Sequence, residues 1–294
     1  MSMKICALTM VYRDHWALSQ WYMHYSSQLG AKNLFVIAHG RDDKIQNICP
    51  EANVITIPRD ELDRFDYIRA KIMNDFHSTL TEEYDWTIRT DADELICLDP
   101  SHYSSFVELL SKRWGPAVFA LGFELVEEQG QTPVPMDTCV FDERIAALFT
   151  GHYSKAWAFR QDARALRHGM EVGKKRASQA NFAMPEGVYL THLKFADTAA
   201  LAKANPHRKE VASSEGTGMP GTAWASPHVE DQRFFSRFRS FQSIPWETAR
   251  NKAYRQLSVD PVREPNSGTV RARGLRFEAT THLPEWFKPG ELKT

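Results

Sequence analysis

The first hundred residues alternate short apolar runs with longer stretches in which apolar side chains recur every three or four positions. Such alternation predicts strands separated by amphipathic helices. Asp14 caps one predicted helix, which ends at Gly30, and a second helix over 67–80 places Ile68 and Ile72 on one face. The predicted strands cover residues 5–12, 33–38, 53–57 and 86–90. Strands that alternate with helices favour an α/β fold whose central sheet is mostly parallel and flanked by helices.

The pattern is less regular beyond residue 100. The predicted elements there are a helix over 100–112, strands over 117–126 and 156–160, a strand from 187 that ends at His192, and a helical run over 198–204. Composition changes at residue 205, where a loop rich in Gly and Ser over 213–221 precedes a basic and aromatic helix over 233–241. In that helix, spacing predicts a buried face of phenylalanines with arginines outside. We therefore predict one domain over 1–204 and an irregular, α-rich extension over 205–294 packed on it.

Two carboxylates at the end of the fourth predicted strand are the main candidates for chemistry. Asp91 and Asp93 are two positions apart, so an extended backbone points both to the same side. Carboxylates held this close repel each other unless a cation joins them, and hard ions such as Mg²⁺ or Mn²⁺ take oxygen ligands. A half-open ion of this kind can hold a diphosphate as a leaving group. The segments 12–14, 39–43 and 91–94 all follow strands, which is where ligands of parallel sheets bind.

Composition narrows the classes of function. The chain has 294 residues, 43% of them hydrophobic and 25% charged, and a net charge of −1, which predicts no binding of nucleic acid. Its four cysteines have no metal-binding spacing. Neither a signal-peptide core nor an apolar run long enough to span a bilayer is present. These features predict a soluble, cytoplasmic protein without a transmembrane segment.

Several segments together resemble the GT-A glycosyltransferases, specifically the family 2-like group related to family 92. The matching segments are WYMHY at 21–25 with Leu29-Gly30, LFVI at 34–37 leading to Asp42-Asp43, and DWTIRTDADEL at 85–95. The resemblance covers about residues 4–100 well and 115–200 loosely. It implies a Rossmann-like GT-A domain, a nucleotide-sugar donor, Mn²⁺ or Mg²⁺, and inverting transfer to the hydroxyl of a saccharide or lipid-linked acceptor.

The resemblance also implies roles for individual residues. Donor contacts are expected from Thr9, Met10, Val11 and Arg13 at the nucleobase, Asp42 at the nucleoside, Arg69 at the base or phosphate, and Asp91 and Lys155 at the diphosphate. The metal ligands are expected to be Asp91, Asp93 and His192. In related enzymes the second aspartate usually meets the metal directly, and the first can instead reach the ribose. For each of these residues an ordinary structural role is the alternative.

The catalytic base has no clear match. An inverting transfer needs a carboxylate that deprotonates the acceptor hydroxyl, and the candidates are Glu124 and Asp231. The loop over 213–221 is expected to close over donor or acceptor, with an ordinary surface loop as the alternative. Contact between the 233–241 helix and an anionic lipid-linked acceptor would make membrane association peripheral.

Two other functions remain as alternatives. One is a non-catalytic relative that binds a nucleotide or glycan. The other is a phosphatase of the haloacid dehalogenase type, whose D-x-D lies on the first strand and continues to Thr or Val. Here the fourth predicted strand carries the motif and Leu95 occupies that position, which disfavours the phosphatase.

Overall fold

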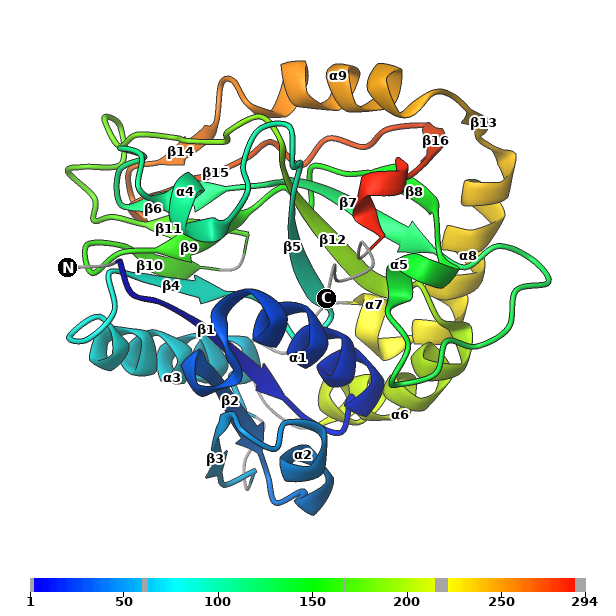
Figure 1. The fold of residues 1–294 in the computed structure, drawn as a ribbon, viewed down its shortest axis with the longest axis horizontal. Helices are drawn as coiled ribbons and strands as arrows, with labels where there is room; N and C mark the ends of the chain where they lie inside the picture. Colours follow the sequence, from blue (N-terminus) through cyan, green and yellow to red (C-terminus); the bar gives the residue numbers. More distant parts are fainter. Residues whose placement is uncertain (1–2, 60–62, 167, 215–221, 289–294) are drawn as a thin grey trace.

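The N-terminal half of the computed structural model is a parallel sheet between helices (Figure 1). The structure describes residues 3–59, 63–166, 168–214 and 222–288. In spatial order the sheet contains β3 (Asn53–Ile57), β2 (Leu34–His39), β1 (Ile5–Val11), β4 (Trp86–Arg89), β9 (Ala156–Phe159) and β6 (Ala117–Phe119). The first four are mutually parallel, and β9 is antiparallel to both β4 and β6. The predicted α/β class is confirmed, and the first four predicted strands lie within one residue of the observed ones.

Helices α1 (His15–Leu29) and α3 (Phe65–Leu80) cover opposite faces of this sheet. Alternate residues of β1 point to opposite sides, so Ala7 packs in the cluster that contains α1, while Leu8 packs against α3. The caps of α1 are as predicted: Asp14 accepts a hydrogen bond from the Ala17 N–H, and Gly30, at φ 79°, ends the helix. Both predicted helices are confirmed.

A second sheet is mixed and lies beside the first (Figure 1). Its order is β13 (Gln242–Ser243), β16 (Ala279–His282), β8 (Ala146–Phe149), β7 (Leu121–Val126), β12 (Val188–Phe195) and β5 (Glu94–Leu98). The prediction of one strand over 117–126 is wrong, because the chain leaves the first sheet at Ala120 and enters the second as β7. The Ala120 N–H donates to the Lys155 carbonyl at this step. Residues 117–126 are all buried, so no polar position marks the break.

The helix predicted over 100–112 is shorter than expected. It is α4 (Phe106–Leu110), capped by the Ser105 hydroxyl, which accepts from the Glu108 N–H. Before it, the Asp99 carboxylate accepts from both the N–H and the hydroxyl of Ser101. This local turn competes with the helix for the same backbone groups, which explains the later start.

The C-terminal part is rich in helices, as predicted, and also contributes strands. Its helices are α6 (Thr198–Ser213), α7 (Thr222–Ala225), α8 (Pro227–Ser240) and α9 (Trp246–Leu257). A small antiparallel sheet joins β10 (Arg164–Leu166) and β11 (Gly169–Glu171) to β15 (Thr269–Arg271) and β14 (Val262–Glu264). The remaining elements are the helices α2 (Asp43–Ile48) and α5 (Val140–Glu143) and the 3-10 turns η1 (Ala31–Asn33) and η2 (Glu285–Phe287). The predicted boundary at residue 204 falls inside α6, so both parts of the chain share elements.

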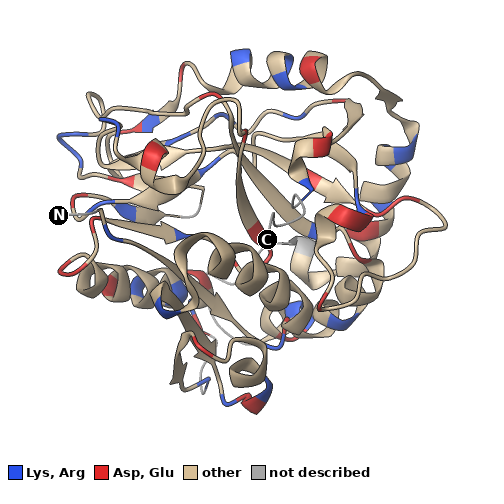
Figure 2. Cartoon of the chain, in the orientation of Figure 1, with Lys and Arg blue, Asp and Glu red and all other residues tan. Residues whose placement is uncertain are grey.

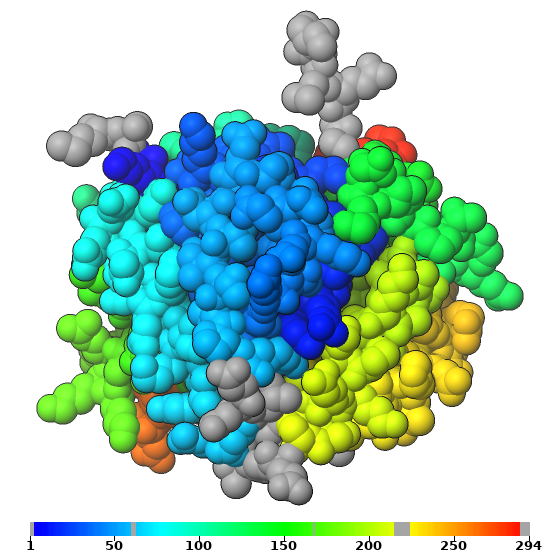
Figure 3. Space-filling view, turned by 90° about the horizontal axis from the view of Figure 1, so that it is seen from below, coloured from blue at the N-terminus to red at the C-terminus, as the bar shows by residue number. Residues whose placement is uncertain are grey.

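Helix α6 lies beside the N-terminal elements on the face shown in Figure 3. In α8, Phe238 and Phe234 pack against Phe195, and Arg233 and Arg237 are exposed, which confirms the predicted amphipathic face. Residues 215–221, most of the predicted Gly- and Ser-rich loop, are outside the described residues. Charges of both signs are interspersed over the elements (Figure 2). No helix in the described ranges is sufficiently long and apolar to cross a bilayer.

A close approach at Gly122 holds the two sheets together. The Gly122 N–H donates to the Ser154 hydroxyl, and a Cβ at position 122 would lie 2.2 Å from the carbonyl carbon of Tyr153. Glycine is therefore required here so that β7 can pass directly beside the segment that carries Lys155.

We predict that Gly122→Ala lowers the free energy of unfolding by about 2 kcal/mol, because the added methyl forces two backbones apart. Gly274→Ala is the matched control, since nothing lies within 4 Å of its Cβ position. Urea unfolding of both variants measures the difference. Equal stability of the two variants would contradict the close approach.

Candidate functional site

A large cavity lies where the strands of the first sheet end. It has a volume of about 540 Å³. One wall of the cavity is formed by the segment after β1 and by the ends of β2 and β4. The other walls come from α3, α6 and β12. The residues that line the cavity include Met10, Val11, Tyr12, Asp14, His39, Arg59, Arg69, Arg89, Asp91, Asp93, Tyr153, Lys155, His192, Lys194 and Arg208. The cavity therefore lies at the carboxyl ends of the strands, where the sequence places the acidic motif.

Two cations hold the first aspartate of the motif. Asp91 Oδ1 is 2.5 Å from the Arg69 guanidinium, and Oδ2 is 3.4 Å from the Lys155 ammonium. Burial alone would raise the pKa of Asp91, but the charges of Arg69 and Lys155 hold it well below its usual range. Asp91 is thus an ionised carboxylate whose two oxygens both face positive charge.

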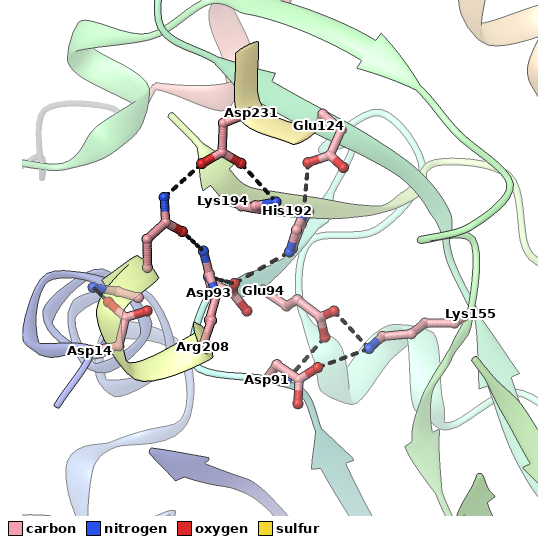
Figure 4. A network of polar contacts seen from close by, with 12 residues as sticks. Asp14, Asp91, Asp93, Glu94, Glu124, Lys155, His192, Lys194, Arg208 and Asp231 are labelled. Atoms are coloured by element: carbon pink, nitrogen blue, oxygen red, sulfur yellow. Dashed lines mark hydrogen bonds and ion pairs between the residues drawn. The ribbon is translucent and has the colours of Figure 1, made fainter. Parts of the chain in front are cut away.

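A buried ion pair lies directly behind Asp91 (Figure 4). Glu94 is fully buried, its Oε1 is 2.7 Å from Lys155 Nζ, and its Oε2 accepts from the Asp91 N–H. Burial raises the pKa of Glu94, and Lys155 opposes that shift. Burial lowers the pKa of Lys155, but Glu94 and Asp91 outweigh it and raise that pKa. The ammonium is consequently fixed beside the motif by a partner that solvent does not reach.

The second aspartate faces a histidine from the other sheet (Figure 4). Asp93 Oδ2 is 3.3 Å from His192 Nε2, and His192 Nδ1 is 2.6 Å from Glu124 Oε2. The imidazole also stacks on the Tyr153 ring, with centroids 3.6 Å apart. Burial would lower the pKa of His192, but Glu124 and Asp93 raise it to about 10. Strands β5 and β12 pair in a register that sets His192 opposite Glu94, which brings the imidazole to the motif.

A chain of polar contacts continues from Asp93 into the C-terminal helices (Figure 4). Arg208 on α6 is 3.7 Å from Asp93 and donates to the Asn205 amide oxygen. Asn205 in turn donates to Asp231 on α8, which also pairs with Lys194 at 3.1 Å. The chain ties the acidic motif to two helices that follow residue 204.

Another part of the cavity lining, which we call the aromatic end, is formed by rings around Tyr12 and Arg59. The Arg59 guanidinium lies 3.6 Å from the centre of the Tyr12 ring and donates toward His39 Nδ1 at 3.2 Å. Burial and the charge of Arg59 lower the pKa of His39 to about 4, so its ring is neutral at pH 7. Phe65 and Trp224 complete this end. Flat rings of this kind suit a planar, uncharged ligand group.

The structure brings only part of the predicted donor-site set to the cavity. Met10 and Val11 line it, whereas Thr9 is fully buried within the sheet. Arg13, at φ 52°, is exposed outside the lining. Asp42 caps α2 and contacts His15 at 2.7 Å, also outside the lining. Of the two predicted bases, neither Glu124 nor Asp231 lines the cavity.

Three residues of the site were missed by sequence analysis. Arg208 lies in the part of α6 that the helical run over 198–204 did not reach. Tyr153 is two residues before Lys155, and no spacing marks it. Arg59 follows the third strand directly, so the rule that ligands bind at strand ends could have identified it.

Asp93 and His192 fit a divalent ion only when the ion replaces the proton on His192 Nε2, because a metal-bound imidazole is neutral at the nitrogen that binds the metal. In an octahedral site with bonds of about 2.1 Å, neighbouring ligands are about 3 Å apart, close to the distance between Asp93 Oδ2 and His192 Nε2. Glu124 contacts the other ring nitrogen of His192, Nδ1. A carboxylate at that nitrogen is the usual partner of a metal-bound histidine. Within the described ranges, no group of three or more His, Cys, Asp or Glu side chains is arranged for a metal. The roles of Asp91, Asp93 and His192 as metal ligands stay predictions.

No protein-family model matches the sequence, and no curated protein matches it. Three solved structures have weak similarity to the chain. The crystal structure of a 4-diphosphocytidyl-2C-methyl-D-erythritol synthase is 15% identical over 55% of this chain and 76% of that chain, with a TM-score of 0.33. A cytidylyltransferase from Leptospira borgpetersenii is 14% identical over 40% of this chain and 54% of that chain (TM-score 0.27). CMP:2-keto-3-deoxy-manno-octonic acid synthetase complexed with CTP is 13% identical over 79% and 98% (TM-score 0.30). Similarity at these levels does not bear on what this chain binds.

We predict that Lys155→Met lowers the free energy of unfolding by about 3–5 kcal/mol, because it leaves the Glu94 carboxylate buried without a partner. The double variant Lys155→Met with Glu94→Gln should recover much of this loss. Lys71→Met, which breaks an exposed pair with Asp75, is the control and should change little. Chemical denaturation measures all three, and purely additive effects of the two substitutions would contradict the coupling.

Proposed function

We propose that the protein is a metal-dependent GT-A glycosyltransferase that moves a sugar from a nucleotide-diphosphate donor to an acceptor hydroxyl. The observation that supports it most is the row Glu124, His192, Asp93, whose last two members line a cavity formed at strand ends. The row would be a metal-binding pair with its supporting carboxylate, and it lies beside the cations that hold Asp91. We also propose that the protein is related to the family 2-like group of these enzymes.

Two parts of the cavity lining suit the two ends of such a donor. The aromatic end with Tyr12 and Arg59 suits the nucleobase, and Met10 and Val11 form the adjacent wall. The diphosphate would lie at the acidic motif, where Arg69 and Lys155 carry positive charge. Lys155 is a buried point charge, so it can face a phosphate without rearranging.

Departure of the nucleotide leaves a diphosphate with growing negative charge. A divalent ion held by Asp93 and His192 would supply Lewis-acid stabilisation of that leaving group. Lys155 and Arg69 stabilise the same charge from the protein side, because their positions are fixed before the reaction. His192 keeps its orientation through Glu124 and the stacked Tyr153 ring.

The acceptor side is less defined. In the described structure the carboxylates that line the cavity are Asp14, Asp66, Asp91 and Asp93. Glu124 contacts His192, and Asp231 contacts Asn205 and Lys194, so each has another structural role. Their assignment as catalytic base, and with it the inverting outcome, stays a prediction. A saccharide or lipid-linked acceptor and a cytoplasmic location are likewise proposed.

A non-catalytic nucleotide binder is the alternative that needs a direct test. Thermal shifts with UDP, GDP, CMP and dTDP sugars, each with and without Mn²⁺, identify the nucleotide, because a ligand of the native state raises its stability. Release of nucleotide from the selected donor then separates an enzyme from a binder. The phosphatase alternative stays disfavoured, since the motif follows β4 rather than the first strand and Leu95 takes the place of Thr or Val.

We predict that Asp93→Ala abolishes transfer and the Mn²⁺-dependent thermal shift by nucleoside diphosphate, because one of the two proposed ligands is lost. Asp43→Ala, which removes an exposed carboxylate paired with Arg41, is the control and should behave as wild type. Circular dichroism checks that both variants are folded. Wild-type metal-dependent binding by Asp93→Ala would exclude the proposed ion site.

We predict further that His192→Ala raises the Mn²⁺ concentration needed for half-maximal activity at least tenfold. Glu124→Gln should raise it less, since the amide oxygen can still accept from Nδ1 and only the charge is lost. Activity measured across a Mn²⁺ series gives both values. An unchanged Mn²⁺ requirement together with a lower melting temperature would assign His192 to the fold alone.

A further inference from the structure

Arg89 is the cavity-lining arginine that the proposed chemistry leaves unused. It ends β4, two residues before Asp91, so the alternation of an extended backbone directs both side chains to one side. Four other cations of the cavity have carboxylate partners among the described residues. These are Arg69 with Asp91, Lys155 with Glu94, Lys194 with Asp231 and Arg208 with Asp93. Arg89 forms no ion pair within the described parts of the chain.

The Arg89 guanidinium is nevertheless held firmly in place. Its Nη1 donates to the Asn74 amide oxygen at 2.5 Å. Asn74, on α3, is itself fixed, because its side chain accepts from the Ala165 N–H and donates to the Ala165 carbonyl on β10. The guanidinium is thus fixed by the fold through Nη1, and Arg89 is among the residues that line the cavity. A rigid fork of this kind is preorganised for an oxyanion.

The surroundings balance the charge of Arg89 only in part. Arg69, on the same helix as Asn74, and Arg164 act on Arg89 with like charge, and Asp91 acts with opposite charge. Asp91 lies nearby, but its oxygens already face Arg69 and Lys155. A half-buried cation without a carboxylate partner is costly. A negatively charged ligand group would remove that cost when it binds.

We propose that Arg89, with Arg69 beside it, binds an anionic group carried by the transferred sugar. The group is an oxyanion, either the carboxylate of an acidic sugar or a phosphate substituent. This inference rests on the proposed donor site. Arg89 lies roughly 7 Å along the strand from Asp91, so a group bound at Arg89 would be separate from the diphosphate that we place at Asp91. The enzyme would then select acidic over neutral donors.

The test compares acidic and neutral nucleotide sugars with the same base. UDP-glucuronate is paired with UDP-glucose, and GDP-mannuronate with GDP-mannose, each with Mn²⁺. Arg89→Gln removes the charge and keeps a donor for Asn74. Arg164→Gln is the matched control, because this arginine is exposed, pairs with Asp75 and lies outside the cavity lining.

Wild type and Arg164→Gln should bind the acidic donor more tightly, and Arg89→Gln should lose about tenfold or more for that donor alone. Binding of UDP or GDP should not change. Equal loss for the free nucleotide would mean that Arg89 holds the diphosphate, and this would overturn the inference. A wild-type preference for neutral donors would overturn it as well. A third result would identify the group as a phosphate. Neither acidic donor would be preferred, and glucose 6-phosphate would raise the melting temperature more than glucose does. This difference would disappear in Arg89→Gln.

A second measurement does not depend on the donor. If no nucleotide sugar binds, the proposed function fails, and the melting temperature of the free protein still tests Arg89. Arg89→Gln should melt higher than wild type, because it removes a like-charge interaction with Arg69. Inorganic phosphate should narrow that gap, because it should stabilise only the protein that keeps Arg89. A lower melting temperature for Arg89→Gln would show that the guanidinium serves the fold and would overturn the inference.

Discussion

The site depends on separating three carboxylates that lie within four consecutive residues. Asp91, Asp93 and Glu94 would repel one another if they shared one environment. Each is instead assigned its own cation: Arg69 for Asp91, His192 for Asp93 and Lys155 for Glu94. These cations come from α3, β12 and the segment before β9. The ion pairs of this one turn therefore connect both sheets and α3.

The same separation gives the turn two different sides. Glu94 faces inward and is fully buried, so its role is to hold Lys155. Asp93 is partly open and faces an imidazole whose far nitrogen is occupied by Glu124. The inner side therefore stabilises the fold, and the outer side is left for a ligand. Closely spaced acidic residues can have opposite roles because burial differs across one turn of chain.

Periodicity and capping predicted the first hundred residues well. The parallel strands follow from the alternation of apolar runs, and the bounds of α1 follow from its caps, Asp14 and Gly30. Because ligands bind at the ends of parallel strands, the position of Asp91 and Asp93 then identified them as site residues. The split of 117–126 was not predictable, because both new strands are buried and the break occurs between sheets. Pro206 and the change in composition concealed the continuation of α6 to Ser213.

Position after a strand located Asp91 and Asp93, whereas tertiary packing decides which other predicted residues reach the cavity. Lys155, just before β9, and His192, within β12, contact the motif. Thr9 does not reach the cavity, because its side chain lies inside the sheet, and Asp42 caps α2 instead. Glu124 was considered as a base because it is a carboxylate in an apolar run. Its partner, His192, is 68 residues away along the chain, which no local pattern reveals.

The spacing of the ion pairs has a consequence for synthesis. Arg69 precedes Asp91 by 22 residues, but Lys155 follows it by 64. On the ribosome, the parallel strands and α1 are complete while Glu94 and Asp93 still lack their cations. The nascent half must keep these carboxylates hydrated or protonated until β9 and β12 emerge. Contacts this distant slow folding, so the acidic turn would be among the last parts of the protein to become ordered.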